Sequence, residues 1–470
     1  MARSKDRHSQ YRRIRARFVS AGCAAAIAAA AIFPNSAQAQ TSERRGPFVR
    51  DAEIEALIRD YAKPIFKVAG LSSQGIKIHL INDTNFNAFV VDGQNMFIHI
   101  GALMKSDTPN QLIGVIAHET GHIAGGHLAR LRNQMSKARS GMLMLQALAI
   151  AAIAAGAVVD TGSNDLSEIG AAVLYGGQSL VQRSILAYRR AEESAADQAA
   201  VSYLNATRQS IRGMLTTFEL FASQILTSSN VNPYLQSHPI PRQRIAQLRE
   251  LARSSAYYDN KDSPELQLRH DMARAKLFGF IELPSTVFNR YRNDTSLPAR
   301  YARAIAQHHN GNLSKAISGL EYLIAKQPNN PYLLETKGQF LHEKGKSKEA
   351  LAPLRKAVAL NPRAGLIRIL LAQALLNAGN KKDVDEAIGH LKKAISRDRT
   401  YPSGYRFLAD AYYRKGRDAE AKLATAHRYL YLGLIPDAKK QASWAKKGLP
   451  RGSVGWVQAD DILVFQPPRR

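Results

Sequence analysis

The sequence predicts a mainly helical protein, in which an α+β domain with a small sheet is followed by an α-solenoid. Three observations support this class. Apolar residues recur at helical spacing along most of the chain, one short region alternates as strands do, and a 34-residue period starts near residue 298. The 470 residues are 45% hydrophobic, which is enough to pack the cores of two or three domains.

The first 39 residues have the features of a secretory signal peptide. Residues 12–17 carry four arginines, residues 18–33 are apolar, and Ala37-Gln38-Ala39 offers a cleavage site before Gln40. The alternative is an uncleaved membrane anchor. The single cysteine, Cys23, lies inside this segment, so the mature chain can use neither disulfides nor thiolate ligands. A secreted chain without thiols suits a bacterial periplasm.

The chain is strongly basic. Residues 1–39 hold seven Lys or Arg and one Asp, hence six of the 27 net positive charges, and the rest of the chain keeps +21. This surplus favours acidic partners such as an anionic membrane face, or else it reflects a generally basic proteome. The sequence has no basic run interleaved with aromatic residues and no nucleic-acid module. We therefore expect no nucleic-acid partner.

The first 250 residues predict helices around one small sheet. Residues 51–70 have helical apolar spacing, and residues 76–81 alternate like a strand. Residues 86–101 predict a hairpin that turns at an Asp-Gly step. Residues 108–135 and 180–227 predict further helices.

A repeat starts after residue 298. Gly311, Gly345 and Gly379 are spaced by 34 residues, and so are Pro328 and Pro362, while the next unit is offset by three residues. A 34-residue period with Gly at the turn between two helices and Pro near the end of the unit is typical of tetratricopeptide repeats. Such units bury their apolar faces only against their neighbours, which makes a curved array with a concave groove.

The connecting segment before the array is broken into short helices by Pro264 and Pro284. The sequence thus predicts five parts: a signal peptide over residues 1–39, a first domain over 40–253, connecting helices over 254–297, a repeat array over 298–450, and a C-terminal tail over 451–470.

An H-E-x-x-H motif stands in the predicted helix 108–135, as His118, Glu119 and His122. Residues four apart on a helix differ by about 40° in azimuth, so His118 and His122 project from one face and can share a tetrahedral ion. Glu119 is one step round the helix and can reach the attacking water without binding the ion. The alternative is an ordinary surface helix with two histidines. The apolar periodicity around the motif favours a buried catalytic helix instead.

A third ligand has two candidates. An extended motif would need a histidine at position 128, where Leu128 stands, and His127 lies about 140° round the helix from His122. We therefore expect His127 to be structural and to point away. Glu193 stands four residues before Asp197, which suits a carboxylate ligand beside a carboxylate that holds a ligand histidine by a hydrogen bond. A solvated acidic helix face is the alternative, but the surrounding alanines indicate close packing.

Residues 141–159 are apolar enough to raise the question of a membrane span. A single crossing would put His118 and Glu193 on opposite sides of the bilayer, where they could not share one ion. Residues 170–186 are too polar for a convincing return pass. We expect a helical hairpin that packs over the site, with contact to a membrane surface left open.

These motifs together resemble the HtpX/CAAX-prenyl-protease group of zinc metallopeptidases, peptidase family forty-eight. The resemblance covers residues 50–250, and the chain looks like a soluble periplasmic branch of the outer-membrane-assembly type that carries a C-terminal tetratricopeptide array. The matching segments are His118-Glu119-Thr120-Gly121-His122, Glu193-Ser194-Ala195-Ala196-Asp197, Asn87-Ala88-Phe89 with Gly93, and His238-Pro239 followed by Arg244.

The resemblance implies a zincin-like α+β peptidase domain that binds one Zn²⁺ per chain. It implies that His118, His122 and Glu193 are the zinc ligands and that Glu119 is the general base. It also implies that Asp197 holds a ligand side chain in place without binding the ion itself. The strand Asn87-Ala88-Phe89 would offer its edge to an extended substrate.

The resemblance leaves the role of His238 open. This residue would either stabilise the oxyanion or fill the open coordination position as a plug, with Arg244 nearby as a switch or transition-state residue. The implied activity is an endopeptidase that cleaves misassembled envelope proteins chosen through the groove of the array. The alternative is a periplasmic chaperone or scaffold for envelope-protein assembly whose zinc site is mostly closed.

Overall fold

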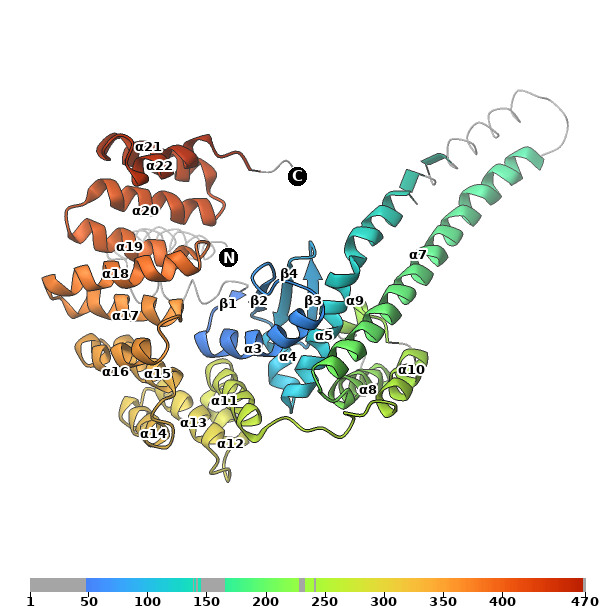
Figure 1. The fold of residues 1–470 in the computed structure, drawn as a ribbon, viewed down its shortest axis with the longest axis horizontal. Coiled ribbons are helices and arrows are strands. Elements are labelled where there is room, and N and C mark those ends of the chain that lie inside the picture. Colours follow the sequence, from blue (N-terminus) through green and yellow to red (C-terminus); the bar gives the residue numbers. More distant parts are fainter. Residues whose placement is uncertain are drawn as a thin grey trace, which may run out of the picture. The chain divides into compact units, whose positions relative to one another are not determined.

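The computed structural model describes residues 48–137, 139–140, 143–144, 165–227, 233–240 and 242–467 (Figure 1). The chain divides into two units, Met1–Val49 and Arg50–Arg470, and strand β1 (Phe48–Val49) is the described part of the first. The predicted signal peptide lies outside the described residues. So does nearly all of the predicted hairpin segment 141–159. Within the described ranges, no helix is long and apolar enough to cross a membrane.

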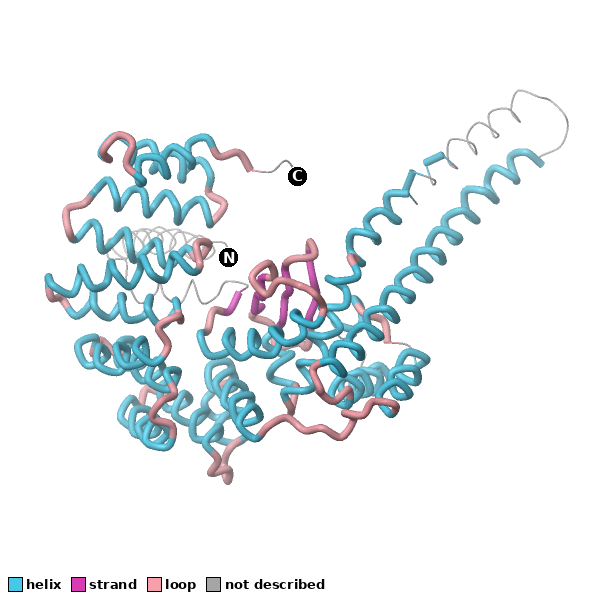
Figure 2. Tube along the Cα trace, viewed as in Figure 1, coloured by secondary structure: helices cyan, strands magenta, loops and turns pink. Residues whose placement is uncertain are grey.

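The second unit contains a small sheet made of β2 (Lys77–Ile81), β3 (Ala88–Val91) and β4 (Asn95–His99), drawn in magenta in Figure 2. Strand β4 pairs in parallel with β2 and antiparallel with β3, which lies at the end of the sheet. The turn between β3 and β4 has positive φ at both Asp92 (57°) and Gly93 (68°), and three residues, 92–94, separate the paired Val91 and Asn95. The predicted hairpin is confirmed.

Seven helices of the described residues accompany this sheet. Their bounds are α3 (Ala52–Val68), α4 (Ile100–Lys105), α5 (Pro109–Gly125), α7 (Asp165–Ala206), α8 (Arg212–Thr227), α9 (Pro233–Ser237) and α10 (Arg242–Arg253). Helix α5 is central, because it packs against α3, α7, α8 and strand β3.

The ends of α5 follow from its local sequence. Pro109 occupies the first turn, and the Gln111 side chain accepts a hydrogen bond from the backbone of Thr108 at 3.3 Å. Gly126 ends the helix in the left-handed region, with φ of 63°. Residues 127–137 are helical again beyond this break. The prediction of one continuous helix over 108–135 is therefore wrong at Gly126.

A glycine brings α5 and α7 close together. A Cβ atom added at Gly121 would lie 2.9 Å from the carbonyl oxygen of Ala196, closer than real Cβ contacts allow. Gly121 stands between Glu119 and His122 on α5, and Ala196 stands beside Asp197 on α7. The close approach at this point therefore sets the distance between the two helices that carry the predicted site.

The connecting segment forms α11 (Pro264–Ile281) and α12 (Pro284–Arg290). Each begins with its proline in the first turn, where the missing N–H costs no hydrogen bond. Helix α11 packs against α3, α4 and α5 on one side and against α13 on the other. It therefore joins the helices around the sheet to the array that follows.

The rest of the described chain is a row of antiparallel helix pairs (Figure 1, orange to red). Each helix contacts the next along the chain, and the turns within pairs use glycine at positive φ, as at Gly345 (77°) and Gly379 (86°). The helices are α13 (Leu297–His309), α14 (Leu313–Lys326), α15 (Pro331–Glu343), α16 (Ser347–Leu360), α17 (Gly365–Ala378), α18 (Lys381–Arg397), α19 (Pro402–Arg414), α20 (Asp418–Tyr431), α21 (Ile435–Gly448) and α22 (Val454–Val464).

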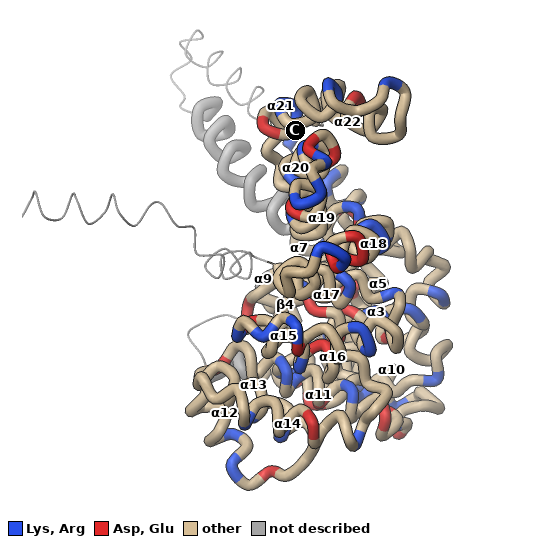
Figure 3. Tube along the Cα trace, turned by 90° about the vertical axis from the view of Figure 1, so that its left-hand side faces the viewer, with Lys and Arg blue, Asp and Glu red and all other residues tan. Residues whose placement is uncertain are grey.

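This arrangement confirms the predicted fold class, a mainly helical protein with a small sheet followed by an α-solenoid of two-helix repeats. Residues 451–470 are not a plain tail, because α22 lies within them and packs against α20 and α21. Buried Ala459 and Ile462 belong to the same apolar cluster as Ala442 of α21, which explains the packing. Figure 3 shows Lys and Arg positions spread over the repeat helices, with acidic positions among them.

A buried cluster of charges, which we call the junction cluster, ties α3 and α11 to the array. It consists of Asp51, Glu53, Lys276, Tyr301 and Glu335. The Lys276 ammonium lies 2.8 Å from Oδ2 of Asp51 and 3.3 Å from Oε2 of Glu53, and the Tyr301 hydroxyl donates to Glu53 at 3.4 Å. Burial opposes the charge of Lys276, but the surrounding carboxylates raise its pKa well above the ordinary value. Burial also raises the pKa of Glu335, to about 8, against the opposing effect of Lys276.

Candidate metal centre

Helix α5 presents His118, Glu119 and His122 inside the protein, where both His118 and Glu119 have no exposed surface. The Nε2 atoms of His118 and His122 lie 3.1 Å apart. The structure thus places the two imidazoles on one side of the helix, as the four-residue spacing predicts.

Helix α7 brings Glu193 to the same point. One carboxylate oxygen lies 3.3 Å from Nε2 of His118, and the other lies 3.6 Å from Nε2 of His122. Glu193 is buried, as the alanine-rich context of its helix predicts. Lone pairs from three side chains therefore converge on one small volume.

His238 follows α9 and joins this group. Its Nδ1 atom lies 3.1 Å from Oε1 of Glu193 and 3.4 Å from Nε2 of His118, while its Nε2 atom lies 3.4 Å from Oε1 of Glu119. The ring of Tyr234 packs against it at 4.8 Å. One ligand atom from each of His118, His122, Glu193 and His238 lies within 4.8 Å of all the others, so these residues could hold a metal ion.

Asp197 and Arg244 surround the group. Oδ1 of Asp197 lies 2.9 Å from Nδ1 of His118, and the Arg244 guanidinium donates to both Asp197 oxygens at 2.8 and 2.9 Å. Arg244 also donates to the Pro239 carbonyl at 2.6 Å and lies 3.0 Å from Glu193. This one side chain therefore links both acids of α7 to the loop that carries His238.

His127 does not point away from the group, so that part of the prediction is wrong. Its Nδ1 atom lies 2.9 Å from Nδ1 of His122. The prediction assumed a continuous helix, but the break at Gly126 turns the chain and brings the ring back over the last turn of α5. The Nδ1 atom of His122 is the nitrogen remote from Glu193, and His127 is absent from the group of converging ligand atoms.

The Glu119 carboxylate is buried, and within the described residues neither oxygen accepts a hydrogen bond. Burial raises its pKa above the ordinary value. A buried acid that accepts no hydrogen bond is costly, which points to a group outside the protein chain as its partner. This observation fits a metal centre in which Glu119 faces the attacking water.

The charges within the group are strongly coupled. Burial alone would raise the pKa of Glu193, but hydrogen bonds from His118 and His238 hold it well below the ordinary value. Burial would lower the pKa of His118, yet its contacts with Asp197 and Glu193 raise it to about 9. A proton on His118 therefore balances the acids here, and a bound cation would replace that proton.

Strand β3 lies beside this group, since it contacts α5. The predicted edge strand is Asn87-Ala88-Phe89, and the structure starts β3 at Ala88, with the Asn87 carbonyl accepting from the backbone of His99 at 2.9 Å. Since β3 ends the sheet, its outer backbone edge is not paired with a described strand. The location of the edge agrees with the prediction.

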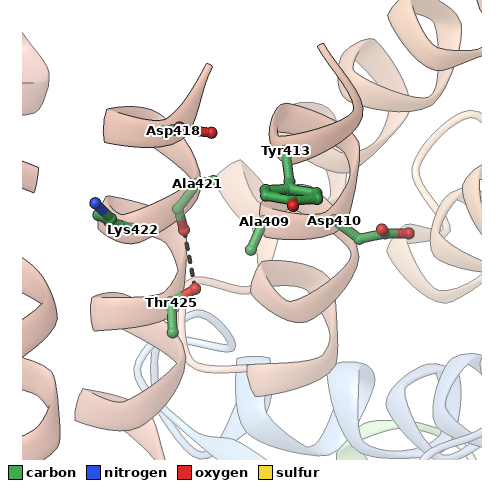
Figure 4. Close-up of a pocket in the computed structure, with 7 residues that line it drawn as sticks. All are labelled: Ala409, Asp410, Tyr413, Asp418, Ala421, Lys422 and Thr425. Carbon is green, nitrogen blue, oxygen red and sulfur yellow. Dashed lines mark hydrogen bonds between the residues drawn. The ribbon is translucent and has the colours of Figure 1, made fainter. Parts of the chain in front are cut away.

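A pocket of about 390 Å³ lies elsewhere, between α19 and α20 of the array (Figure 4). It contains none of the converging residues. The Tyr413 ring stands over its rim, and the Thr425 hydroxyl donates to the Ala421 carbonyl at 2.9 Å. The lining residues are Ala409, Asp410, Tyr413, Asp418, Ala421, Lys422 and Thr425.

Comparison with known protein families gives a match over residues 49–252 to the model of peptidase family M48. The match includes all of the converging residues. The chain carries a metalloprotease domain of peptidase family M48. This agrees with the buried H-E-x-x-H helix and with the family that the sequence motifs resemble.

Curated relatives extend the similarity beyond this domain. The beta-barrel assembly-enhancing protease of Escherichia coli (strain K12) is 23% identical over 422 residues, which is 88% of this chain and 83% of the relative. Metalloprotease LoiP of the same organism is 27% identical over 198 residues, 41% of this chain and 70% of LoiP. The mitochondrial metalloendopeptidase OMA1 of Schizosaccharomyces pombe is 37% identical over 67 residues, 14% of this chain and 20% of OMA1.

Among solved structures, the crystal structure of MamA aligns with 34% of this chain and 90% of its own. The sequence identity is 22% and the TM-score is 0.28.

Two residues beside the converging side chains were not predicted from the sequence. Tyr234 is fully buried against His238, and Glu192 lies 3.0 Å from Nε2 of His127. Glu192 stands next to Glu193 in the sequence, so a doubled acid at the third-ligand position was the available signal. Tyr234 had no such signal, because its role depends on how α9 packs.

Proposed function

We propose that this metalloprotease binds one Zn²⁺ through His118, His122 and Glu193, and that it acts as an endopeptidase on proteins of the bacterial cell envelope. The observation that carries the proposal is the convergence of these ligand atoms beside the buried carboxylate of Glu119, which accepts no hydrogen bond from the described residues. Imidazole and carboxylate ligands with no thiolate are typical of a catalytic zinc site.

The distances within the group suit zinc. Zinc binds His nitrogen and Glu oxygen at about 2.0–2.2 Å, and the edges of such a tetrahedron are about 3.3 Å long. The separations of 3.1 Å between the two α5 histidines, and of 3.3 and 3.6 Å from them to Glu193, lie around this value. Asp197 fixes the ring of His118 from behind, as carboxylates do for zinc-bound histidines.

The chemistry follows from these residues. When bound, zinc lowers the pKa of water and polarises the scissile carbonyl. Glu119 takes a proton from the attacking water and returns it to the leaving amine. Arg244 keeps Asp197 and Glu193 in place instead of facing the substrate.

An extended substrate would lie along the outer edge of β3, next to Asn87, Ala88 and Phe89. Its backbone would continue the ladder of the sheet, and the edge leads past α5. Such binding recognises backbone more than side chains, which suits proteins that have failed to fold.

The cellular role rests on the leader and on the relatives. We assign residues 1–39 to a cleaved signal peptide that sends the chain to the periplasm, residues 40–253 to the peptidase domain and residues 298–450 to the repeat array. The array holds 28 Lys and Arg against 12 Asp and Glu, a net charge of +16, so its clients would present acidic surfaces. A relative that is named as enhancing β-barrel assembly supports misassembled envelope proteins as clients.

A second candidate function is a chaperone or scaffold with a mostly closed zinc site. The protease relatives do not favour it, but the position of His238 fits a closed site, because its Nδ1 atom lies about as close to the ligand atoms as they lie to one another. There it can act as a fourth ligand and fill the position that a substrate carbonyl needs. The other role of His238, stabilising the oxyanion through Nε2, would require the loop after α9 to shift.

The primary test is Glu119→Gln. The variant should keep a zinc-to-protein ratio of one but lose cleavage of fluorescent casein by about 10²- to 10⁴-fold, because the general base is gone. Glu219→Gln, which changes an exposed acid on α8, is the matched control and should cleave like the unaltered chain. Equal cleavage by both variants would rule out the assignment of Glu119.

His238→Ala separates its two roles. If His238 is a plug, the variant should cleave casein faster; if it stabilises the oxyanion, cleavage should fall.

Glu193→Ala should lose bound zinc, measured as the metal-to-protein ratio. Rescue of a deletion strain by the inactive Glu119→Gln variant would favour the scaffold over the protease.

A further inference from the structure

The Nδ1 atoms of His118 and His122, the two histidines of α5, contact different kinds of side chain. His118 has a buried carboxylate, since Asp197 lies 2.9 Å from its Nδ1 atom. Among the described residues, no carboxylate lies against the corresponding nitrogen of His122. Its Nδ1 atom instead lies 2.9 Å from Nδ1 of His127, and the two rings stand at 86° to each other.

The chain is built to place His127 at this point. Helix α5 ends at Gly125, and Gly126 adopts a left-handed conformation that L side chains rarely take. A Cβ atom on Gly125 would lie 2.1 Å from Nε2 of His127. Both glycines are therefore needed for the ring to fold back over the helix end.

The second nitrogen of His127 is held as well. Nε2 lies 3.0 Å from Oε2 of Glu192, and the Arg130 guanidinium donates to both oxygens of that carboxylate, at 2.8 and 3.3 Å. His122 thus connects through His127 to an acid that is fixed by an arginine. Asp197 and Arg244 form the same kind of pair behind His118, without an intervening histidine.

The hydrogen bonds define the tautomers. Nε2 of His122 faces His118 and Glu193, so its lone pair must be free for a metal and its proton must sit on Nδ1. Nδ1 of His127 must then accept that proton in a hydrogen bond, which leaves the proton of His127 on Nε2, directed at Glu192. A carboxylate accepts such a bond, so each N–H along the series His122, His127 and Glu192 faces an acceptor.

We propose that His127 and Glu192 are positioning residues, which hold His122 in the tautomer and orientation that bind the metal. This inference rests on the proposed metal site and extends it. His127 is not a ligand itself, because it contacts the side of His122 that faces away from Glu193. Outer partners of this kind typically change metal affinity by about 10- to 100-fold.

Two substitutions at His127 test the inference. His127→Phe keeps the ring but removes the acceptor, whereas the side-chain oxygen of His127→Asn can take the place of Nδ1. Zinc dissociation constants, measured by competition with a chelator, should rise about 10- to 100-fold for Phe and by less than about 3-fold for Asn. The absorption spectrum of the Co²⁺-loaded protein should change for Phe and stay close to the original for Asn.

His79→Phe is the matched control, because it makes the same change on β2, where His79 bonds to Asn95. It should leave zinc affinity unchanged. Unchanged affinity in His127→Phe, or an equal loss in Phe and Asn, would overturn the role of His127. If the unaltered chain itself bound neither zinc nor cobalt, the proposed metal site would be wrong, and the inference that rests on it would be wrong as well.

Discussion

The protein contains two buried clusters of charged residues, and they differ in what completes them. The junction cluster holds three carboxylates around Lys276, whose ammonium lies 2.8 Å from Asp51 and 3.3 Å from Glu53. The metal centre directs lone pairs inward from two histidines of α5, Glu193 and His238. The junction cluster therefore holds its cation at its centre, whereas the metal centre has the Arg244 guanidinium at its edge and directs its lone pairs at a point where an ion could bind.

This difference helps to tell a structural cluster from a functional one. In the junction cluster, a donor lies beside Asp51 and Glu53, as where Tyr301 donates to Glu53, although one oxygen of Glu335 has no hydrogen-bond partner among the described residues. In the metal centre, acceptors face acceptors, and both oxygens of Glu119 are without a hydrogen bond among the described residues. Both clusters are largely buried, although the Asp51 side chain is 20% exposed, so the balance of donors and acceptors decides the interpretation.

The largest expected effect on stability comes from removing the internal cation. Lys276→Met should lower the free energy of unfolding by about 3–5 kcal/mol, because it leaves buried carboxylates without a counter-charge. Lys337→Met removes a surface pair with Glu321 in the repeat array and should cost about 1 kcal/mol or less. Urea unfolding measures both. If the two losses were equal, the junction cluster would not be held together by its charges.

Metal binding should stabilise the other cluster. Zinc at 100 times its dissociation constant should raise the free energy of unfolding by about 2.7 kcal/mol. Lys276→Met should keep this gain, and Glu193→Ala should lose it, as measured by unfolding with and without zinc. A gain that survived in Glu193→Ala would place the zinc elsewhere in the chain.

A pH-dependent effect concerns Glu335, whose pKa is raised to about 8 by burial. The folded protein keeps this proton at pH values where the unfolded chain has lost it, so stability falls as pH rises from about 4.5 to about 8. The slope from this one group reaches at most about 1.4 kcal/mol per pH unit. Glu335→Gln should remove that slope, so it should be more stable than the unaltered chain at pH 7 and close to it near pH 4.5. Parallel pH profiles for the two proteins would contradict the assigned pKa.

Much of the metal centre was predictable because its residues lie close together in sequence on regular helices. His118 and His122 share a face by helical geometry alone, and Glu193 and Asp197 repeat the same spacing on α7. Helical spacing failed at His127, because one glycine in a left-handed conformation ended the helix between the two histidines. The error lay in the backbone and not in the chemistry of the residue.

The junction cluster was not predictable in this way. Its members come from the start of α3, from α11, α13 and α15, so no local spacing relates them. Asp51 and Lys276 are separated by more than two hundred residues, and each would pass for a surface charge when read in isolation. Only the packing of α11 between the two parts of the chain brings them together.

The sequence by itself determined the repeat period, the hairpin turn and the pairs of residues that share one helix face, because these depend on contacts between near neighbours. The tertiary structure alone decided that α7 approaches α5 closely enough for Glu193 to contact both histidines. It also decided that His238 contacts Glu193 and His118 while His127 contacts the far nitrogen of His122. It also decided which buried acids have a cation of their own. Those outcomes depend on side chains that meet only after the helices have packed, which no periodicity along the chain records.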